Sequence, residues 1–215
     1  MAGESRVALS KRAQAVARRL RNAWPDSRCS LHHDSAHQLL VATILSAQCT
    51  DARVNQVTPA LFTRWPDAAA LAGAPREELA AAVHACGYHN QKARSIQGAC
   101  RRIVEEHGGQ VPATLEELIR LPGVGRKTAN CVLGAWHGKP ALVVDTHMIR
   151  ILGLLGLVAS RDPEVIEREM MALLPPAEWV AFTHRIIDHG RAVCVARRPR
   201  CGECVLADLC PSAMD

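Results

Sequence analysis

The chain has 215 residues and a formal net charge of +5, and it is long enough to bury a sizeable core in one domain or two small ones. Aromatic residues make up only 3% and no stretch alternates valine, isoleucine and threonine, so the composition favours an all-helical fold over a β-rich one. The pI near 8.8 suits a polyanionic partner, and no segment has the apolar length of a signal peptide or a membrane span, so we expect a cytosolic protein.

Apolar residues recur at helical spacing along the whole chain, in segments separated by Pro, Gly, Asn or Asp. We expect helices at 8–22, 34–48, 51–64, 76–86, 90–107, 114–120, 126–137, 146–157, 163–174 and 178–189. Only Ala141-Leu142-Val143-Val144 is strand-like, and four residues are too few to build a sheet. There is no linker or repeat between the segments. The sequence therefore predicts an all-α protein.

The loop Gly87-Tyr88-His89-Asn90 lies between two of these helices and carries the only tyrosine of the chain. Gly87 can end the preceding helix in a left-handed conformation, which would direct the Tyr88 ring outward. The ring could instead pack back onto the two helices, and the sequence leaves both possibilities open.

The run Leu121-Pro122-Gly123-Val124-Gly125 has the pattern of a helix-hairpin-helix. Thr114 and Glu117 form a capping box at the start of the helix before it, and another helix follows directly. Gly123 and Gly125 allow backbone conformations that are closed to other residues, so the turn can direct amides at a phosphate without reading a base. An ordinary tight turn between helices would show the same residues, and this alternative stays open.

Lys127 follows directly, in the first turn of the second hairpin helix. The positive end of the helix dipole disfavours an ammonium there, and Arg126 beside it adds to the effect. Both favour the neutral amine, which nucleophilic attack and Schiff-base formation require, although partial burial would have to supply most of any large effect. A charged lysine that binds phosphate is the alternative.

Asp145 precedes the helix that begins Thr146-His147-Met148. Its default role is the N-cap of that helix. A carboxylate at the mouth of a cleft could also stabilise positive charge developing on a sugar ring, or help to activate a nucleophile. The two roles are compatible.

The nine cysteines divide into a scattered set and a compact C-terminal group. The scattered thiols, which we expect to be small buried hydrophobes, are Cys29, Cys49, Cys86, Cys100 and Cys131. The compact group is Cys194, Cys201, Cys204 and Cys210, whose spacing lets four thiolates converge on one centre. Zinc modules usually pair two close-spaced cysteine knuckles, and here only Cys201 and Cys204 form one. The spacing favours an iron-sulfur cluster, with zinc as the alternative.

Arginines accompany this cysteine group, and they indicate either a phosphate clamp or an ordinary solvated basic surface. They are Arg191, Arg197, Arg198 and Arg200.

Taken in order, these motifs closely resemble the endonuclease III family through nearly the whole chain. The matching stretches are Leu45-Ser46-Ala47-Gln48, Thr50-Asp51, Leu121 to Asn130, Val144-Asp145-Thr146-His147, His189-Gly190-Arg191 and the four C-terminal cysteines.

The resemblance implies two helical domains with DNA in the cleft between them. One is a six-helix barrel over 29–139 that contains the helix-hairpin-helix at about 114–137. The other joins 1–28 to 140–215 around a [4Fe-4S] cluster on the four cysteines. We expect a monomer in the bacterial cytosol or nucleoid, bound to double-stranded DNA with damaged bases or abasic sites and to no membrane.

The resemblance also implies the activity, which is removal of oxidised pyrimidines in base excision repair followed by strand cleavage through β-elimination. Lys127 matches the nucleophile, Asp145 the catalytic carboxylate and Gln48 a residue inserted where the damaged base is flipped out. Tyr88 could enter the base stack beside the extruded nucleotide. The DNA contacts we expect come from Gln48, Tyr88, His89, Gly123, Val124, Gly125, Arg126, Thr128, His147, Arg191, Arg197, Arg198 and Arg200.

The alternatives are an adenine glycosylase, a DNA-binding module with a degenerate site, and an iron-sulfur electron carrier or zinc adaptor. The adenine branch lacks the lysine and uses a glutamate in the helix that here runs from Ala42 to Gln48 without a carboxylate. The chain departs from the family at Cys49, where alanine is frequent, and at Tyr88-His89, where an aliphatic residue followed by tyrosine is frequent. These departures concern lesion preference rather than the class of reaction.

Overall fold

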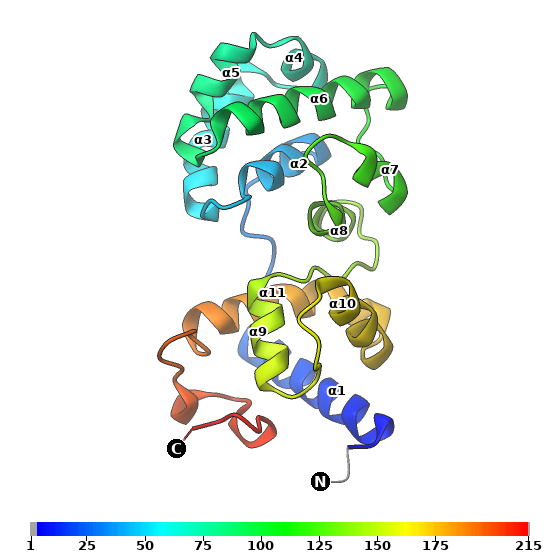
Figure 1. The fold of residues 1–215 in the computed structure, drawn as a ribbon, viewed down its shortest axis with the longest axis vertical. Coiled ribbons are helices and arrows are strands. Elements are labelled where there is room, and N and C mark those ends of the chain that lie inside the picture. The colour runs from blue at the N-terminus through cyan, green and yellow to red at the C-terminus, as the bar shows by residue number, and fades with distance from the viewer. Residues whose placement is uncertain (1–3, 215) are drawn as a thin grey trace. The chain divides into compact units, whose positions relative to one another are not determined.

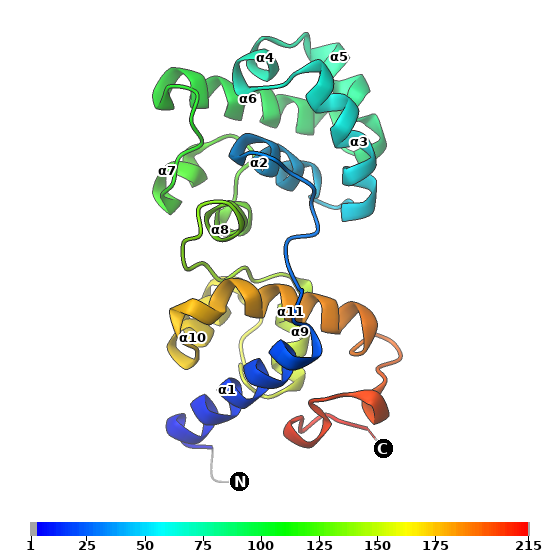
Figure 2. The same cartoon turned by 180° about the vertical axis from the view of Figure 1, so that it is seen from behind.

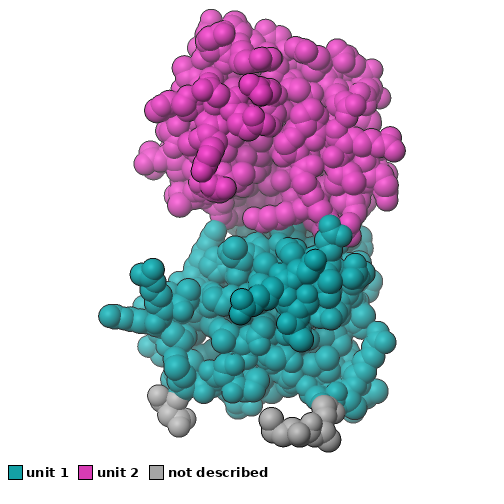
Figure 3. Space-filling model, viewed as in Figure 1, with its two compact units in different colours: residues 1–28, 140–215 teal, residues 29–139 magenta. Residues whose placement is uncertain are grey.

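The computed structural model describes residues 4–214, and this part of the chain is helical and contains no strand (Figures 1 and 2). The chain divides into two compact units, coloured separately in Figure 3. Unit 1 joins Met1–Arg28 to Pro140–Asp215, and unit 2 is the continuous segment Cys29–Lys139. The two chain segments of unit 1 are therefore separated in sequence by the whole of unit 2.

Unit 2 is built around the long helix α6, which packs against α2, α4 and α5. Helix α2 is buried on nearly every side, which explains why its sequence is apolar without a polar face. The elements of unit 2 are α2 (Ala36–Leu45), α3 (Asp51–Arg64), α4 (Ala68–Gly73), α5 (Arg76–Ala82), η1 (His84–Cys86), α6 (His89–His107), α7 (Leu115–Arg120) and α8 (Arg126–Ala135).

Unit 1 packs the N-terminal helix against helices from the last third of the chain. Helix α1 contacts α10 and α11, and α9 also packs on α11. Leu20, Met148 and Phe182 are fully buried in the core of this unit. The elements are α1 (Arg6–Ala23), α9 (Thr146–Leu154), α10 (Pro163–Leu173), η2 (Pro176–Glu178), α11 (Trp179–Ala192), η3 (Cys201–Glu203) and η4 (Ala207–Leu209).

Two arginines of α1 fasten the chain segments of unit 1 to one another. Arg12 donates to the backbone oxygens of Leu155 and Gly156, the latter at 3.0 Å. Arg19 pairs with the carboxylate of Asp208 through both terminal nitrogens, so α1 also holds the C-terminal loop.

Three sequence expectations need correction. The short helix α4 was missed, because six residues after its cap Asp67 are too few to show a helical period. The segment 76–86 is not one helix but α5 followed by the 3-10 turn η1. Helix α2 ends at Leu45 rather than at residue 48.

The strand-like segment 141–144 forms neither a helix nor a strand. Its Val143 N–H donates to the Thr183 hydroxyl at 3.2 Å, so a side chain of α11 takes the place of a neighbouring strand. The all-α prediction is confirmed.

Candidate functional site

The helix-hairpin-helix of unit 2 consists of α7, the turn 121–125 and α8, and it lies against α6. Thr114 caps α7 as expected, with its hydroxyl accepting from the Glu117 N–H at 3.3 Å. Gly123 has a φ of +77°, and a Cβ placed there would lie 2.5 Å from the Cβ of Ser95 on α6. This position therefore requires glycine both for its backbone conformation and for the close approach.

The second hairpin glycine has a different role from the one expected. Gly125 has a φ of −91°, which any residue can adopt, and a Cβ there would meet nothing within 4 Å. It is the N-cap of α8 and has no side chain that could accept a hydrogen bond from the first N–H groups of the helix. Helix geometry gives the N–H groups of Lys127 and Thr128 no acceptor within α8, so they suit an anion that approaches the turn.

The hairpin residues differ in their exposure to solvent, and so in whether a ligand can reach their side chains. The Val124 side chain is buried, and its N–H donates to the Leu121 oxygen at 3.1 Å, so Val124 shapes the turn from inside. Lys127 is exposed. An approaching ligand can therefore reach its amine.

Asp145 in unit 1 is the N-cap of α9, as its default role predicts. Its Oδ1 accepts from the Met148 N–H at 2.9 Å. His184 of α11 is near enough to be influenced by this carboxylate, and burial lowers the pKa of His184 while Asp188 and Asp145 act to raise it. The cap fixes the orientation of the carboxylate at the start of the helix.

His147 lies two residues further along α9 and packs against α11. A Cβ on Gly190 would come within 2.5 Å of the His147 Nδ1, so the ring occupies the space that this glycine leaves open. Gly190 belongs to the His189-Gly190-Arg191 motif, and its role is to admit this ring.

Two loops of unit 2 share an unusual backbone conformation. Among residues 4–214, only Gln48 and Tyr88 have a positive φ without being glycine, with values of 53° and 47°. Both side chains are exposed, Tyr88 at 67%. The alternative that the tyrosine packs back onto its helices is therefore wrong. The left-handed residue is Tyr88 itself, because Gly87 combines a φ of 71° with a ψ of 161°.

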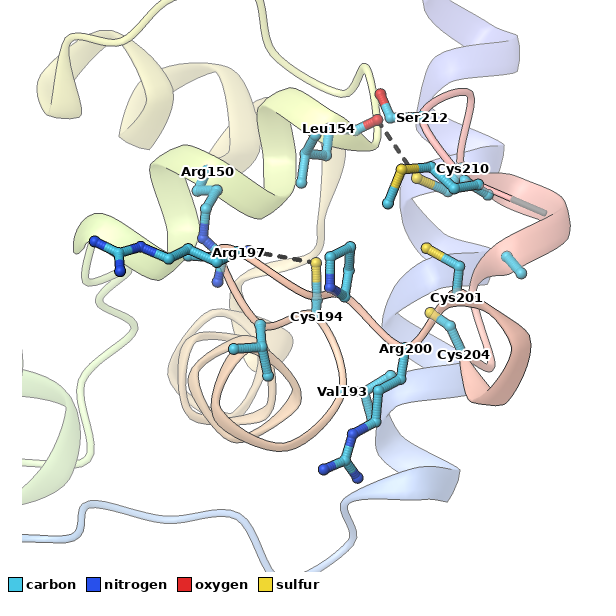
Figure 4. Close-up of a pocket in the computed structure, with 16 residues that line it drawn as sticks. Arg150, Leu154, Val193, Cys194, Arg197, Arg200, Cys201, Cys204, Cys210 and Ser212 are labelled. Atoms are coloured by element: carbon cyan, nitrogen blue, oxygen red, sulfur yellow. Dashed lines mark hydrogen bonds between the residues drawn. The ribbon is translucent and has the colours of Figure 1, made fainter.

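The four C-terminal cysteines of unit 1 surround one cavity of about 280 Å³ (Figure 4). Cys194 follows α11, Cys201 begins η3, and Cys204 and Cys210 directly follow η3 and η4. A cluster that contains several irons is larger than a single metal ion, and four thiolates around one cavity are the ligands that it takes.

The sulfurs need a cationic group to be held as thiolates, because burial and neighbouring like charges act against the charged form. Burial raises the pKa of the Cys204 thiol, and the three neighbouring thiols add to this because like charges repel. A cationic metal group would offset that repulsion. The Leu206 N–H donates to the Cys204 sulfur and the Arg150 guanidinium to the Cys194 sulfur, both at 3.4 Å.

Sequence reasoning missed Arg150 and assigned no role to His189. The His189 Nε2 lies 3.5 Å from the Cys204 sulfur, and burial together with Arg150 lowers the pKa of His189. The sequence signal that could have identified Arg150 is that it is the one arginine of the otherwise largely apolar helix α9, where a half-buried charge needs a partner.

The arginines of the cysteine loop are exposed, as a basic surface requires. Figure 4 shows the guanidinium groups of Arg197 and Arg200 pointing away from the sulfurs, although both residues line the cavity. Arg200 also lies 3.9 Å from the Glu203 carboxylate. Arg191 and Arg198 are exposed nearby in the sequence. The loop thus separates sulfur ligands on its inner side from cations on its outer side.

The fold and these sites define a class of protein: an all-α protein with a glycine-dependent helix-hairpin-helix in one unit and a four-cysteine metal loop in the other. Residues 41–176 match the HhH-GPD superfamily base excision DNA repair proteins, and residues 194–210 match the iron-sulfur binding domain of endonuclease III. The chain belongs to the endonuclease III family of base excision DNA repair proteins, and its four cysteines form an iron-sulfur site.

Its relatives cover almost its full length. Endonuclease III of Synechocystis is 55% identical, over 94% of this chain and 93% of that protein. Endonuclease III of Escherichia coli K12 is 38% identical, over 89% and 91%. A solved non-covalent complex of endonuclease III with DNA superimposes with a TM-score of 0.91 at 38% identity, covering 95% of this chain and 96% of the other. A trapped covalent endonuclease III–DNA intermediate gives the same values.

The family, the fold class, the base excision repair function and the iron-sulfur site predicted from the sequence are confirmed. No helix within residues 4–214 has the length and apolar character needed to cross a membrane.

Proposed function

We propose that the protein removes oxidised pyrimidines from duplex DNA and then cuts the strand 3′ to the abasic site, with Lys127 as the nucleophile for both reactions. The observation that carries this proposal is the position of Lys127: an exposed amine in the first turn of α8, directly after a turn built to receive a phosphate. A lysine with no such neighbouring phosphate site could not be held against a sugar of the DNA backbone.

The Lys127 Nζ attacks the sugar C1′ of the damaged nucleotide while the bond from C1′ to the base nitrogen breaks, and the base leaves with a proton. The nitrogen gives up its protons as the C1′–O4′ bond opens, O4′ takes up one proton to become a hydroxyl, and an imine between Nζ and C1′ remains. Removal of a C2′ proton then expels the phosphate from C3′ and cuts the strand. Water hydrolyses the remaining imine and restores the amine.

Asp145 acts electrostatically on the first step and assists proton movement. A carboxylate near the sugar stabilises the positive charge that develops as the base leaves. The N-cap bond from the Met148 N–H holds this group at one oxygen, Oδ1, and so orients it.

The base must leave the stack before this chemistry is possible. Gln48 and Tyr88, exposed on two short loops of unit 2, fill the space it vacates, and His89 follows Tyr88 in the chain. Gly125, Arg126 and Thr128 hold a phosphate at the hairpin, with Gly123 and Val124 shaping the turn. His147 and the basic residues Arg191, Arg197, Arg198 and Arg200 extend the contact along the DNA backbone.

The iron-sulfur site holds a [4Fe-4S] cluster, which when bound to Cys194, Cys201, Cys204 and Cys210 supplies a rigid support for the basic loop. Unit 2 is the hairpin domain and unit 1 the cluster domain, and both contact the DNA. The protein works as a monomer on the DNA of a bacterial cytosol.

Borohydride trapping tests the proposal. The wild-type protein should form a covalent adduct with a duplex that contains an oxidised pyrimidine, and Lys127→Ala should form none while retaining affinity for the duplex. Lys139→Ala is the matched control, because this lysine is in the same unit and should leave trapping unchanged. A persistent adduct in Lys127→Ala would assign the nucleophile to another residue.

A further inference from the structure

Lys92 has a buried amino group that takes no part in the function proposed above. The residue lies in the first turns of α6 and is 5% exposed. Its Nζ donates to the Leu45 backbone oxygen at 2.8 Å and to the Cys86 backbone oxygen at 2.7 Å. Its partners within residues 4–214 are therefore carbonyl groups that are far apart in sequence.

The two carbonyls mark the ends of the elements that lead into the exposed loops. Leu45 is the last residue of α2, three residues before Gln48, and Cys86 is the last residue of η1, two residues before Tyr88. Carbonyls at the end of a helix lack partners within the helix and carry partial negative charge, so an ammonium suits them. Lys92 is also joined to the second loop directly, because its own N–H donates to the Tyr88 oxygen at 2.9 Å.

These loops need external support. Gln48 and Tyr88 are the two non-glycine residues of the described chain with a positive φ, a conformation that side chains rarely adopt and that persists only where surrounding contacts enforce it. A buried ammonium without a carboxylate partner is itself costly, whereas methionine would fill similar space without charge. The charge at position 92 therefore points to a specific task, which is to join the two turns.

We propose that Lys92 is a positioning residue for base extrusion: its ammonium joins the ends of α2 and η1 so that Gln48 and Tyr88 are presented together to the duplex. This inference rests on the proposed insertion of both side chains into DNA. Lys92 touches neither the sugar nor the base, and it acts only through the two loops.

The test compares trapping rates on a duplex abasic site with those on the same oligonucleotide as a single strand, which has no stack to enter. Lys92→Met should lower the duplex rate about tenfold while leaving the single-strand rate unchanged, so the ratio of the two rates falls. Lys92→Arg, which keeps charged donors, should restore most of the ratio, and Lys92→Gln should fall between the two. Amide exchange should quicken at 46–50 and 86–89 in Lys92→Met.

Lys139→Met is the matched control, since its Nζ donates to a single carbonyl, that of Ala113 at 2.5 Å, away from both loops. It should change neither the ratio nor the exchange. If Lys92→Met is too unstable to assay, the ratio in Lys92→Gln and Lys92→Arg decides in its place.

Combined variants separate this inference from the function on which it rests. Adding Lys92→Met to Gln48→Ala and Tyr88→Ala should cost little beyond those two changes, because the residue acts through them. If the two loop changes lower the ratio but every Lys92 variant leaves it intact, only the role of Lys92 is wrong. If the loop changes themselves leave the ratio intact, insertion and positioning are both wrong. Equal losses on duplex and single strand would make Lys92 a purely structural residue.

Discussion

Gly123 lies against Ser95 so closely that a Cβ on the glycine would come 2.5 Å from the serine Cβ and 2.7 Å from its Oγ. The hairpin turn can approach α6 only because residue 123 has no side chain. Gly98 of α6 contributes to the same contact, since a Cβ there would lie 3.1 Å from Pro122. The position of the hairpin, and with it that of Lys127, therefore depends on this contact with α6.

Gly123→Ala should destabilise unit 2 by roughly 2–5 kcal/mol, because the left-handed backbone and the crowding against Ser95 both oppose a methyl group. Urea unfolding measures the loss. Ser95→Gly should recover part of this loss in the double variant by removing the crowding, but not the part due to the backbone.

Gly125→Ala is the contrasting variant: its stability should be unchanged while affinity for an abasic duplex falls, because the new methyl group faces the phosphate. Equal effects at both glycines would contradict this difference.

Asp145→Asn should slow base removal by roughly 10²–10⁴-fold and leave stability nearly unchanged, because asparagine keeps the cap but not the charge. Single-turnover rates and melting temperatures separate the two effects. Asp162→Asn is the control, since Asp162 caps α10 in the same way, by accepting from the N–H groups of Glu164 and Val165. A large loss of stability in Asp145→Asn, or an unchanged rate, would reduce Asp145 to a structural cap.

Tyr88→Ala should weaken binding and processing of lesions in duplex DNA, because an inserted ring contributes about 1–3 kcal/mol by stacking on a base. Tyr88→Leu should retain much of both. Since the ring is 67% exposed, neither change should shift the melting temperature by much. A marked fall in the melting temperature, or undiminished duplex processing by Tyr88→Ala, would exclude the inserted ring.

The freshly purified native protein should be yellow-brown and contain about four irons per chain. Cys204→Ser should lose iron and DNA affinity together, because the ligands and the exposed arginines share one loop. Cys100→Ala, which changes a core thiol of unit 2 whose pKa burial raises to about 12, should keep its iron. Stoichiometric zinc without iron in the wild-type protein would overturn the assignment.

The free energy of unfolding should fall as the pH falls below about 6.5, the ordinary pKa of histidine. Burial lowers the pKa of His37 and of His137, so both stay neutral in the folded unit 2 at a pH where the unfolded chain binds protons. The stability present above pH 6.5 is therefore lost as the pH drops through the lowered values. Urea unfolding from pH 7.5 to 5.5 should show that stability depends less steeply on pH in His37→Gln than in the wild-type protein.

Much of the helical framework was predictable, because helix ends depend on local chemistry. Thr114, Asp145 and Asp162 each accept a bond from the first turn of the following helix, and such caps can be recognised in the sequence. The segment 51–64 was placed correctly at both ends, from Thr50 as cap to the aromatic residue that follows.

The features that were not predictable depend on contacts between residues far apart in the chain. Gln48 was expected to continue a helix, since nothing in its neighbours shows that the backbone turns left-handed there. Lys92 resembles an ordinary surface residue until the carbonyl groups that it contacts are known. The requirement for glycine at position 123 was anticipated from its turn, but its neighbour Ser95 was not.

The division of unit 1 into two chain segments affects the order in which the protein can fold during synthesis. On the ribosome, α1 emerges before unit 2. All of unit 2 is then synthesised before α10 and α11, the helices that pack on α1. The acceptors of Arg12 and Arg19 lie 143 and 189 residues further along the chain. Bringing the two segments of unit 1 together therefore has an entropic cost of loop closure. A chain that stops before residue 210 lacks the fourth sulfur ligand, and one that stops before residue 208 also lacks the carboxylate that pairs with Arg19. The iron-sulfur loop and its arginines can therefore assemble only after translation has passed the last cysteine, and cofactor loading becomes a late, post-translational step.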